Sequence, residues 1–312
     1  MSKVAFVFPG QGSQKVGMGK DLFEKFPEAR AVFEAVDDVL GDKLSARCFD
    51  GPEDELKLTA NTQPAILTMS LAVHAVFSQR GPAPAFVAGH SLGEYSALVA
   101  AGALALGDAA QAVRKRGTFM QEAVPVGTGA MAAVLGLEPG QVKAVCDAVA
   151  EGEVLAPANY NSPEQTVIAG HTAAVKRAEA KLKEAGAKRV MHLPVSAPFH
   201  CTLMDPVKPL LLDVLGKMKV SAPRIPVVSN VEARPNSEAA RVVPLLVEQV
   251  SAPVRWLECV EALHAEGVTR VVELGPGKVL AGLVKRINKG IETFNIEDSA
   301  SLEKTLAALG AA

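Results

Sequence analysis

The stretch FVAGHSLGEYSALVAAG, residues 86–102, carries the strongest structural signal in the chain. A short apolar run leads into GHSLG at 89–93, and an alanine-rich segment with helical character follows from Leu92 to Ala101. This order is typical of a nucleophile elbow, in which Ser91 occupies a strained turn between strand and helix. Glycines two positions on either side of the serine allow close packing. The pattern predicts a nucleophilic serine; a serine that only caps a helix is the alternative.

Strands and helices alternate on both sides of this stretch. We expect strands at residues 3–8, 85–88 and 268–273. We expect helices at residues 20–40, 63–79 and 279–288. The first strand runs into the glycine-rich turn PGQGSQ. Alternation of this kind predicts a parallel sheet with helices on its faces. We therefore expect an α/β fold with an α/β-hydrolase-like core.

The pattern changes near Gly127. The next segment is predicted to form strand, helix, strand, strand, helix and strand, at residues 129–135, 139–150, 155–161, 166–169, 173–185 and 189–195. The order βαββαβ is ferredoxin-like, and its first and last strands lie side by side, so both ends emerge together. We expect a discontinuous catalytic domain, residues 1–126 and 197–312, that carries an inserted ferredoxin-like subdomain, residues 127–196.

Composition excludes several classes of protein. The 312 residues include 32 Lys and Arg against 34 Asp and Glu, a formal net charge of −2, without the basic excess typical of nucleic-acid binding. No apolar run reaches the roughly 18 residues of a membrane span, and the first residues lack a secretory signal. We expect a cytoplasmic protein with neither nucleic-acid nor membrane partners. The four cysteines have no CxxC spacing, so we expect reduced thiols and no metal site.

A serine nucleophile needs a base, and the chain has six histidines. His200 is the best candidate, because Pro198 places it in a loop that returns to the catalytic domain. Two others fall within expected helices, two fall in the insert, and His90 adjoins Ser91. The acid of a Ser–acid–His triad is missing, since Asp108 and Asp147 both fall on expected helices and no glutamate fits better. We therefore expect another group, such as a backbone carbonyl, to orient His200.

One arginine is expected inside the catalytic domain. Arg116 falls in the middle of the apolar stripe of a helix expected at residues 108–124, whereas Arg114 and Lys115 project away from it. A buried guanidinium is costly unless an anion pairs with it. The anion is either a protein carboxylate or the carboxylate of a substrate held by the two-pronged guanidinium, and both interpretations remain open.

Seven motifs, in order, resemble one known family over nearly the whole chain. They are FPGQGSQ at 8–14, GHSLGEYSALVAAG at 89–102, RGTFMQEA at 116–123, NYNSP at 159–163, PFH at 198–200, Gln249 with PVRW at 253–256, and ELGPGKVL at 273–280. They resemble the malonyl-CoA:acyl carrier protein transacylases of bacterial type II fatty-acid synthesis. They are also similar to the acyltransferase domains of polyketide synthases.

The resemblance implies a ping-pong reaction through a malonyl-serine intermediate. Ser91, with His200 as its base, would attack malonyl-CoA, and the phosphopantetheine thiol of acyl carrier protein would then accept the malonyl group. The implied partners are malonyl-CoA and acyl carrier protein, and the implied state is a monomer. No cofactor is implied, because the phosphopantetheine belongs to the carrier.

The resemblance also implies roles for individual residues. The backbone N–H groups of Gln11 and Leu92 would form an oxyanion hole, and Arg116 would pair with the malonyl carboxylate. The carbonyl of Gln249, and not its side chain, would orient His200. Asn161 is expected in the pocket near His200, and Phe199 is associated with selection of malonyl over methylmalonyl. Ala252, where relatives often carry Asn or Ser, would affect only local loop hydrogen bonds.

Three alternatives stay open. A serine thioesterase or esterase is disfavoured by the missing acid and by the inward Arg116. A stand-alone acyltransferase of a polyketide pathway would share all the motifs. A carrier-binding scaffold without activity is disfavoured by intact Ser91, His200 and Arg116. The acidic carrier is expected on a basic patch, although a solvated helix face is an equally good explanation of these cations: Lys188, Arg189, Lys285, Arg286 and Lys289.

Overall fold

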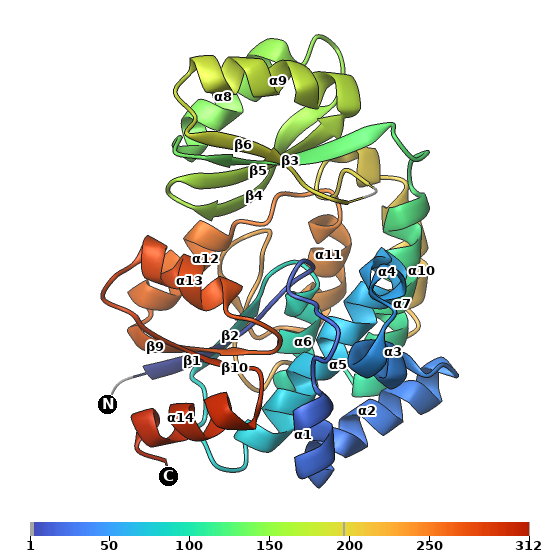
Figure 1. Cartoon of the computed structure of the whole chain (residues 1–312), viewed down its shortest axis with the longest axis vertical. Helices are drawn as coiled ribbons and strands as arrows, with labels where there is room; N and C mark the ends of the chain where they lie inside the picture. Colours follow the sequence, from blue (N-terminus) through green and yellow to red (C-terminus); the bar gives the residue numbers. More distant parts are fainter. Residues whose placement is uncertain (1–2, 196, 312) are drawn as a thin grey trace.

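The computed structural model describes residues 3–195 and 197–311, so the expected domain boundaries at residues 1, 196 and 312 lie outside it. Two sheets form two layers, one above the other in Figure 1. The larger sheet has the order β10-β9-β1-β2-β7-β8. Its strands are β1 (Lys3–Phe8), β2 (Phe86–Gly89), β7 (Val227–Val228), β8 (Pro235–Asn236), β9 (Val268–Leu274) and β10 (Glu292–Ile296). All its strand pairs are parallel except β7–β8, so the expected parallel α/β sheet is present.

Alternate residues of β1 point to opposite faces of this sheet. Phe6 and Phe8 join the main core, and Ala5 and Val7 join a second core under two helices, α12 (Trp256–Ala265) and α13 (Val279–Ile287). The remaining helices of this layer are α1 (Lys20–Lys25), α2 (Pro27–Leu40), α3 (Leu44–Asp50), α4 (Glu53–Lys57), α5 (Thr59–Phe77), α6 (Gly93–Ala100), α7 (Leu106–Glu122), α10 (Val207–Leu215), α11 (Ala239–Gln249) and α14 (Ser299–Leu309), with a 3₁₀ turn at Thr202–Met204. None of the helices in the described residues is long and apolar enough to cross a bilayer.

The structure corrects the expected helix at residues 20–40. Two helices, α1 and α2, occupy this range, because Phe26 is extended (φ −124°, ψ 117°). The proline that follows, Pro27, disfavours the helical conformation at the residue before it. The short helices α3 and α4, the edge strand β10 and the C-terminal helix α14 were not predicted.

The smaller sheet is antiparallel, with the order β4-β5-β3-β6. Its elements follow the expected sequence of strands and helices: β3 (Gly129–Leu135), α8 (Pro139–Val149), β4 (Leu155–Ser162), β5 (Gln165–His171), α9 (Thr172–Glu184) and β6 (Arg189–His192). Helices α8 and α9 cover its outer face (Figure 1). Met131 and Ala133 on the inner face belong to the main core. Strand β6 ends three residues earlier than expected.

Main-chain hydrogen bonds join the smaller sheet to the larger layer. The Tyr160 N–H donates to the Val254 carbonyl (2.9 Å), and the Val254 N–H donates to the Ala158 carbonyl (2.8 Å). Val254 therefore forms a parallel bridge with Asn159 in β4. The segment between α11 and α12 thus pairs with the edge strand β4 of the smaller sheet at one residue.

Candidate active site

Ser91 lies in a strained turn between β2 and α6. Its φ is 51°, a left-handed conformation that L-residues rarely adopt. A Cβ at Gly89 would overlap the backbone of Gly93, and one at Gly93 would overlap the carbonyl of Phe8. Only glycine fits at both positions, as the elbow pattern predicts. The Ser91 N–H donates to Asn230 Oδ1 (2.7 Å), which fixes the turn from the side of β7.

His200 is hydrogen-bonded to Ser91. Its Nε2 lies 2.7 Å from Ser91 Oγ, and its Nδ1 lies 2.9 Å from the Gln249 carbonyl and 3.2 Å from the Ala252 carbonyl. Because carbonyls only accept, the proton belongs on Nδ1, and Nε2 is free to accept from the serine. Burial, helped by the Arg116 charge, lowers the pKa of His200 to about 3. The imidazole is therefore neutral at neutral pH, and the lone pair of Nε2 is available to accept the Ser91 proton.

Two backbone N–H groups border the same pocket. Gln11, in the turn after β1, and Leu92, which precedes α6, both line it. Within the part of the chain that the structure describes, neither N–H has a hydrogen-bond acceptor. The Gln11 side chain is anchored by a bond from Nε2 to Thr59 Oγ1 (3.2 Å). Two residues that line the pocket together with Ser91 thus have free backbone N–H groups, one at a helix N-terminus, and groups of this kind stabilise a negative oxygen.

Arg116 on α7 is buried, with 1% of its surface exposed. Its Nη1 donates to Gln63 Oε1 (2.8 Å), and its Nη2 donates to Ser91 Oγ (3.1 Å) and Gln249 Oε1 (2.9 Å). Its Nε is buried and has no hydrogen-bond partner in residues 3–195 and 197–311. No carboxylate forms an ion pair with Arg116 among the described residues. The structure thus gives the guanidinium no direct carboxylate partner, and its pairing with a substrate carboxylate stays a prediction.

The Gln249 side chain takes part in the site, which the sequence interpretation missed. Besides accepting from Arg116, its amide donates from Nε2 to Glu94 Oε2 (2.8 Å) and to the Ser91 carbonyl (3.0 Å). Glu94 Oε2 also accepts from the Asn230 N–H (3.0 Å). Burial raises the pKa of Glu94 to about 7. Glu94 lies three residues after Ser91, in the first turn of α6. This position is the sequence feature that could have placed it in the candidate site.

Two neighbouring cavities share part of their walls. The catalytic pocket, about 90 Å³, contains Ser91, His200 and Arg116 and is partly walled by Phe199. A second cavity, about 280 Å³, shares Gln11, His90, Asn159 and Leu193 with it and continues between β5 and α13.

Asn161 lines the second cavity, and its Oδ1 is 2.8 Å from Nε2 of His90, which lines both cavities. Its expected place near His200 stays a prediction. Asn159, two residues earlier in β4, lines the catalytic pocket.

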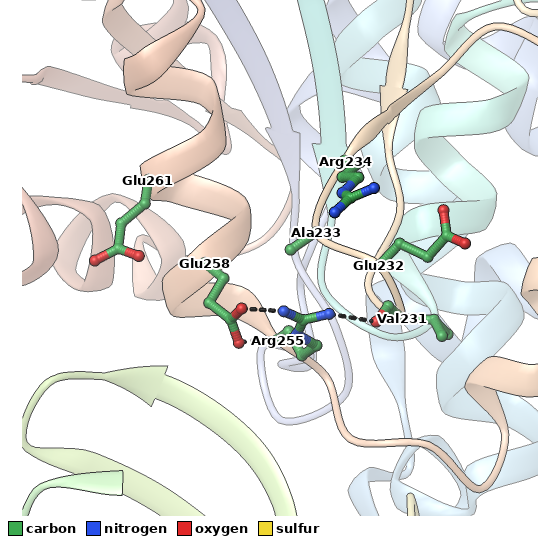
Figure 2. A pocket seen from close by; sticks show the side chains of 7 residues that line it. All are labelled: Val231, Glu232, Ala233, Arg234, Arg255, Glu258 and Glu261. Atoms are coloured by element: carbon green, nitrogen blue, oxygen red, sulfur yellow. Dashed lines mark hydrogen bonds and ion pairs between the residues drawn. The ribbon is translucent and has the colours of Figure 1, made fainter. Parts of the chain in front are cut away.

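A third, wider hollow of about 530 Å³ lies behind the loop that follows β7. In Figure 2, Glu258 and Glu261 on α12 lie on one side of it, and Glu232 and Arg234 of this loop lie on the other. Arg255 between them is already satisfied by Glu258 and by the Val231 carbonyl (3.1 Å). None of the residues discussed above for the candidate site lines this hollow.

The fold and the site define a class of α/β proteins with a serine–histidine pair at the carboxyl end of a parallel sheet. A family model described as the acyl transferase domain matches residues 5–304. The chain belongs to this acyl transferase family.

Relatives span the whole chain. The malonyl CoA-acyl carrier protein transacylase of Bacillus subtilis (strain 168) is 50% identical over 99% of this chain and 98% of the relative. An acyl carrier protein S-malonyltransferase from Vibrio cholerae superposes with a TM-score of 0.95 at 48% identity, covering 97% of this chain and all of the other. A type II PKS malonyl-transacylase, solved in complex with its acyl carrier protein, has a TM-score of 0.96 at 46% identity, with 98% and 100% covered.

Proposed function

We propose that this acyltransferase moves the malonyl group from malonyl-CoA to the phosphopantetheine thiol of an acyl carrier protein. The observation that carries the proposal is the buried Arg116, whose Nη2 lies 3.1 Å from Ser91 Oγ and whose Nε is unpartnered. A cation in this place suits an acyl group that ends in a carboxylate. Relatives named for the same reaction support the proposal.

The proposed mechanism uses Ser91 and His200 in two half-reactions. His200 Nε2 takes the proton from Ser91 Oγ, which attacks the thioester carbonyl, and the new negative oxygen faces the N–H groups of Gln11 and Leu92. As the C–S bond breaks, the thiolate receives the proton from His200. The carrier thiol then attacks the malonyl-serine ester by the same steps in reverse. These steps require no metal or cofactor bound to the chain.

We assign the second cavity to the pantetheine arm of either thioester. The cavity meets the catalytic pocket at Asn159, whose Oδ1 is buried and unpartnered. Asn161 and Gln165 offer further amide groups along its wall. A pantetheine arm contains amides that need such partners. The cavity opens beside α13, where Val279 is 54% exposed.

The carrier would dock at this opening. Arg286 on α13 reaches across to Gln165 on β5 (3.2 Å). Lys285 and Lys289 lie beside Arg286 on or just after α13, exposed and without ion pairs in the described part of the chain. Lys188 and Arg189 extend the proposed patch at β6, although Lys188 pairs with Glu164 (3.4 Å). Reversing the charge at Lys285 should slow transfer to the carrier far more than acylation by malonyl-CoA.

We also propose the finer description of the fold. The larger layer would be an α/β-hydrolase-like catalytic domain, residues 1–126 and 197–312, and residues 127–196 an inserted ferredoxin-like subdomain. The four strands of the smaller sheet lie, from β6 to β4, in the order fourth, first, third and second. The adjacent antiparallel pair β3–β6 supports this description, because it brings the two ends of the segment together.

Mass spectrometry after mixing with malonyl-CoA tests the proposed function. We expect a malonyl adduct on Ser91 that persists until the phosphopantetheinylated carrier is added. Ser91→Ala should form no adduct, and His200→Ala should form it roughly 10²- to 10⁴-fold more slowly. The matched control is Ser96→Ala, which removes another buried hydroxyl of α6 that has no partner and should still be malonylated.

Other outcomes favour the alternatives. Loss of the adduct to water without a carrier indicates a thioesterase, and no adduct indicates a carrier-binding scaffold. Carriers of the fatty-acid and polyketide types, compared as acceptors, distinguish the two pathways. Cys201 is not a rival nucleophile, because burial raises its thiol pKa to about 11.

A further inference from the structure

Arg116 and Glu94 are the two ends of a buried chain of hydrogen bonds. Among the described residues the guanidinium donates hydrogen bonds only to neutral oxygens, and its link to the Glu94 carboxylate runs through the Gln249 amide. Arg116 can only donate, and an ionised Glu94 can only accept. The amide must therefore keep Oε1 toward Arg116 (2.9 Å) and Nε2 toward Glu94 (2.8 Å). Glu94 thus balances the buried cation without occupying its donors.

A second carboxylate in this site changes the charge balance. With Arg116 and an ionised Glu94 the buried pair is neutral, and a substrate carboxylate would leave one uncompensated negative charge in a buried site, which is costly. Protonation of Glu94 restores neutrality. The acceptor for that proton is Oε1, because Oε2 already accepts from Asn230 and Gln249. A cavity of about 10 Å³ beside Glu94, walled partly by Ser229 and Asn236, has room for one water molecule.

We propose that Glu94 is the counter-ion of Arg116 in the unloaded enzyme, and that a substrate carboxylate replaces it while Glu94 takes up one proton from solvent. The inference rests on the proposed malonyl transfer. No covalent bond to carbon changes, and the only group gained is the proton on Oε1. Glu94 is a positioning residue, since it acts on Arg116 through the Gln249 amide.

The other titratable groups that face Glu94 keep their protonation states near neutral pH. They are Arg116 on α7, Tyr95 on α6 and Cys259 on α12. Burial raises the pKa of both Tyr95 and Cys259, so both stay neutral. Gln249 on α11 and Asn230 after β7 do not titrate. With its pKa raised to about 7 by burial, Glu94 is the group of this set that can exchange a proton in the neutral range.

The pH dependence of acylation tests the inference. A bound carboxylate raises the pKa of Glu94 further, so malonyl-CoA reacts best with the protonated form. The second-order rate constant for acylation of the wild type should fall by up to about tenfold per pH unit above about pH 7. Glu94→Gln keeps an acceptor for Asn230 and Gln249 but cannot titrate, so this fall should vanish. Acetyl-CoA, which brings no carboxylate, should show no such fall with the wild type.

Rapid quenching and mass spectrometry at about pH 6 and about pH 8 give these rate constants. Glu273→Gln is the matched control, because Glu273 is a second buried carboxyl with a pKa of about 7 that only accepts from backbone N–H groups of α13. Its malonyl profile should keep the fall. Equal slopes in the wild type and Glu94→Gln would overturn the inference. If Glu94→Gln does not fold, equal slopes for malonyl-CoA and acetyl-CoA in the wild type would overturn it. A wild type that forms no malonyl adduct would instead contradict the proposed function.

Discussion

In the proposed function, the choice of substrate depends on Arg116. Arg116→Ala would leave the malonyl carboxylate buried and unpaired, which typically costs about 3–5 kcal/mol. Malonyl transfer should therefore fall on the order of 10²- to 10³-fold, while acetyl transfer holds steady or rises relative to it. Acylation of the folded variant by the two thioesters, followed by mass spectrometry, measures both.

Arg116→Lys provides the control for this prediction. It keeps the charge but not the planar two-pronged geometry, so it should restore malonyl transfer only in part. A parallel loss with both thioesters in Arg116→Ala would contradict the substrate-carboxylate assignment.

Gln249 has two separable roles. Gln249→Ala keeps the carbonyl that accepts from His200 (2.9 Å) but removes the amide between Arg116 and Glu94. Because the carbonyl that orients His200 remains, the variant should keep much of its activity with acetyl-CoA, which does not depend on the contacts of Arg116. Loss of a buried hydrogen-bond partner costs about 1–3 kcal/mol, so malonyl transfer should fall roughly 10- to 100-fold. Steady-state rates with both thioesters check this, and an equal loss with acetyl-CoA would show that His200 has also moved.

Sequence patterns located some site residues and missed others for a physical reason. The GHSLG pattern predicts the role of Ser91, and helical periodicity predicts the burial of Arg116. Both signals depend only on residues that are neighbours in the sequence. Glu94 and Gln249 meet across 155 positions, and no local pattern encodes such a pairing. The same holds for Asn161, whose partner His90 lies 71 positions away.

At the scale of elements, the junction of β1, β2 and α6 depends on Gly93. In Gly93→Ala the new Cβ would overlap the Phe8 carbonyl, so α6 must shift together with the Leu92 N–H. Overpacking of this kind typically costs about 1–3 kcal/mol, and acylation by malonyl-CoA and acetyl-CoA should fall alike. Urea denaturation and single-turnover acylation measure the two effects.

Gly140→Ala is a suitable control for this substitution. Gly140 lies in the first turn of α8, and a Cβ there meets nothing within 4 Å. This variant should lose neither stability nor activity. A Gly93→Ala enzyme as stable and active as Gly140→Ala would show that α6 tolerates the added methyl group.

Elements with strong periodicity were predictable, and elements set by packing were not. The buried strands and the longer helices have apolar patterns that fix their type. Strand β10 (ETFNI) is exposed at its start and only half-buried along most of its length, so its sequence lacks a strand pattern. It forms because β9 offers a free edge for parallel pairing. The break between α1 and α2 has a local cause, because Pro27 disfavours the helical conformation at Phe26.

At the scale of the whole molecule, buried titratable groups set the pH range of stability. Burial raises the pKa of Glu94 and Glu273 from 4.5 to about 7, so the folded state holds their protons more tightly and stability is lost as the pH rises through 7. Burial lowers the pKa of His74 and His200 from 6.5 to about 4 and about 3, so their contribution is lost as the pH falls below 6.5. The two trends oppose each other between 4.5 and 6.5.

We therefore expect a broad stability maximum in that interval, with a decline on either side. Thermal unfolding from about pH 4 to about pH 9 measures it. The double variant Glu94→Gln and Glu273→Gln should show a weaker decline on the alkaline side. An unchanged alkaline decline would mean that other groups cause it.

The hydrogen bonds of Val254 connect the smaller sheet to the segment that contacts His200. Met131 and Asn159 of that sheet line the catalytic pocket. Val254 is hydrogen-bonded to β4 of the smaller sheet. The carbonyl of Ala252, two residues earlier, accepts a hydrogen bond from His200. An acyl chain too bulky for the pocket would wedge the two layers apart, and the same displacement would draw His200 away from Ser91. Size discrimination would then be kinetic as well as steric. An oversized thioester would still bind, but His200 would lie too far from Ser91 to take its proton. The turnover of that thioester would therefore fall more steeply than its affinity.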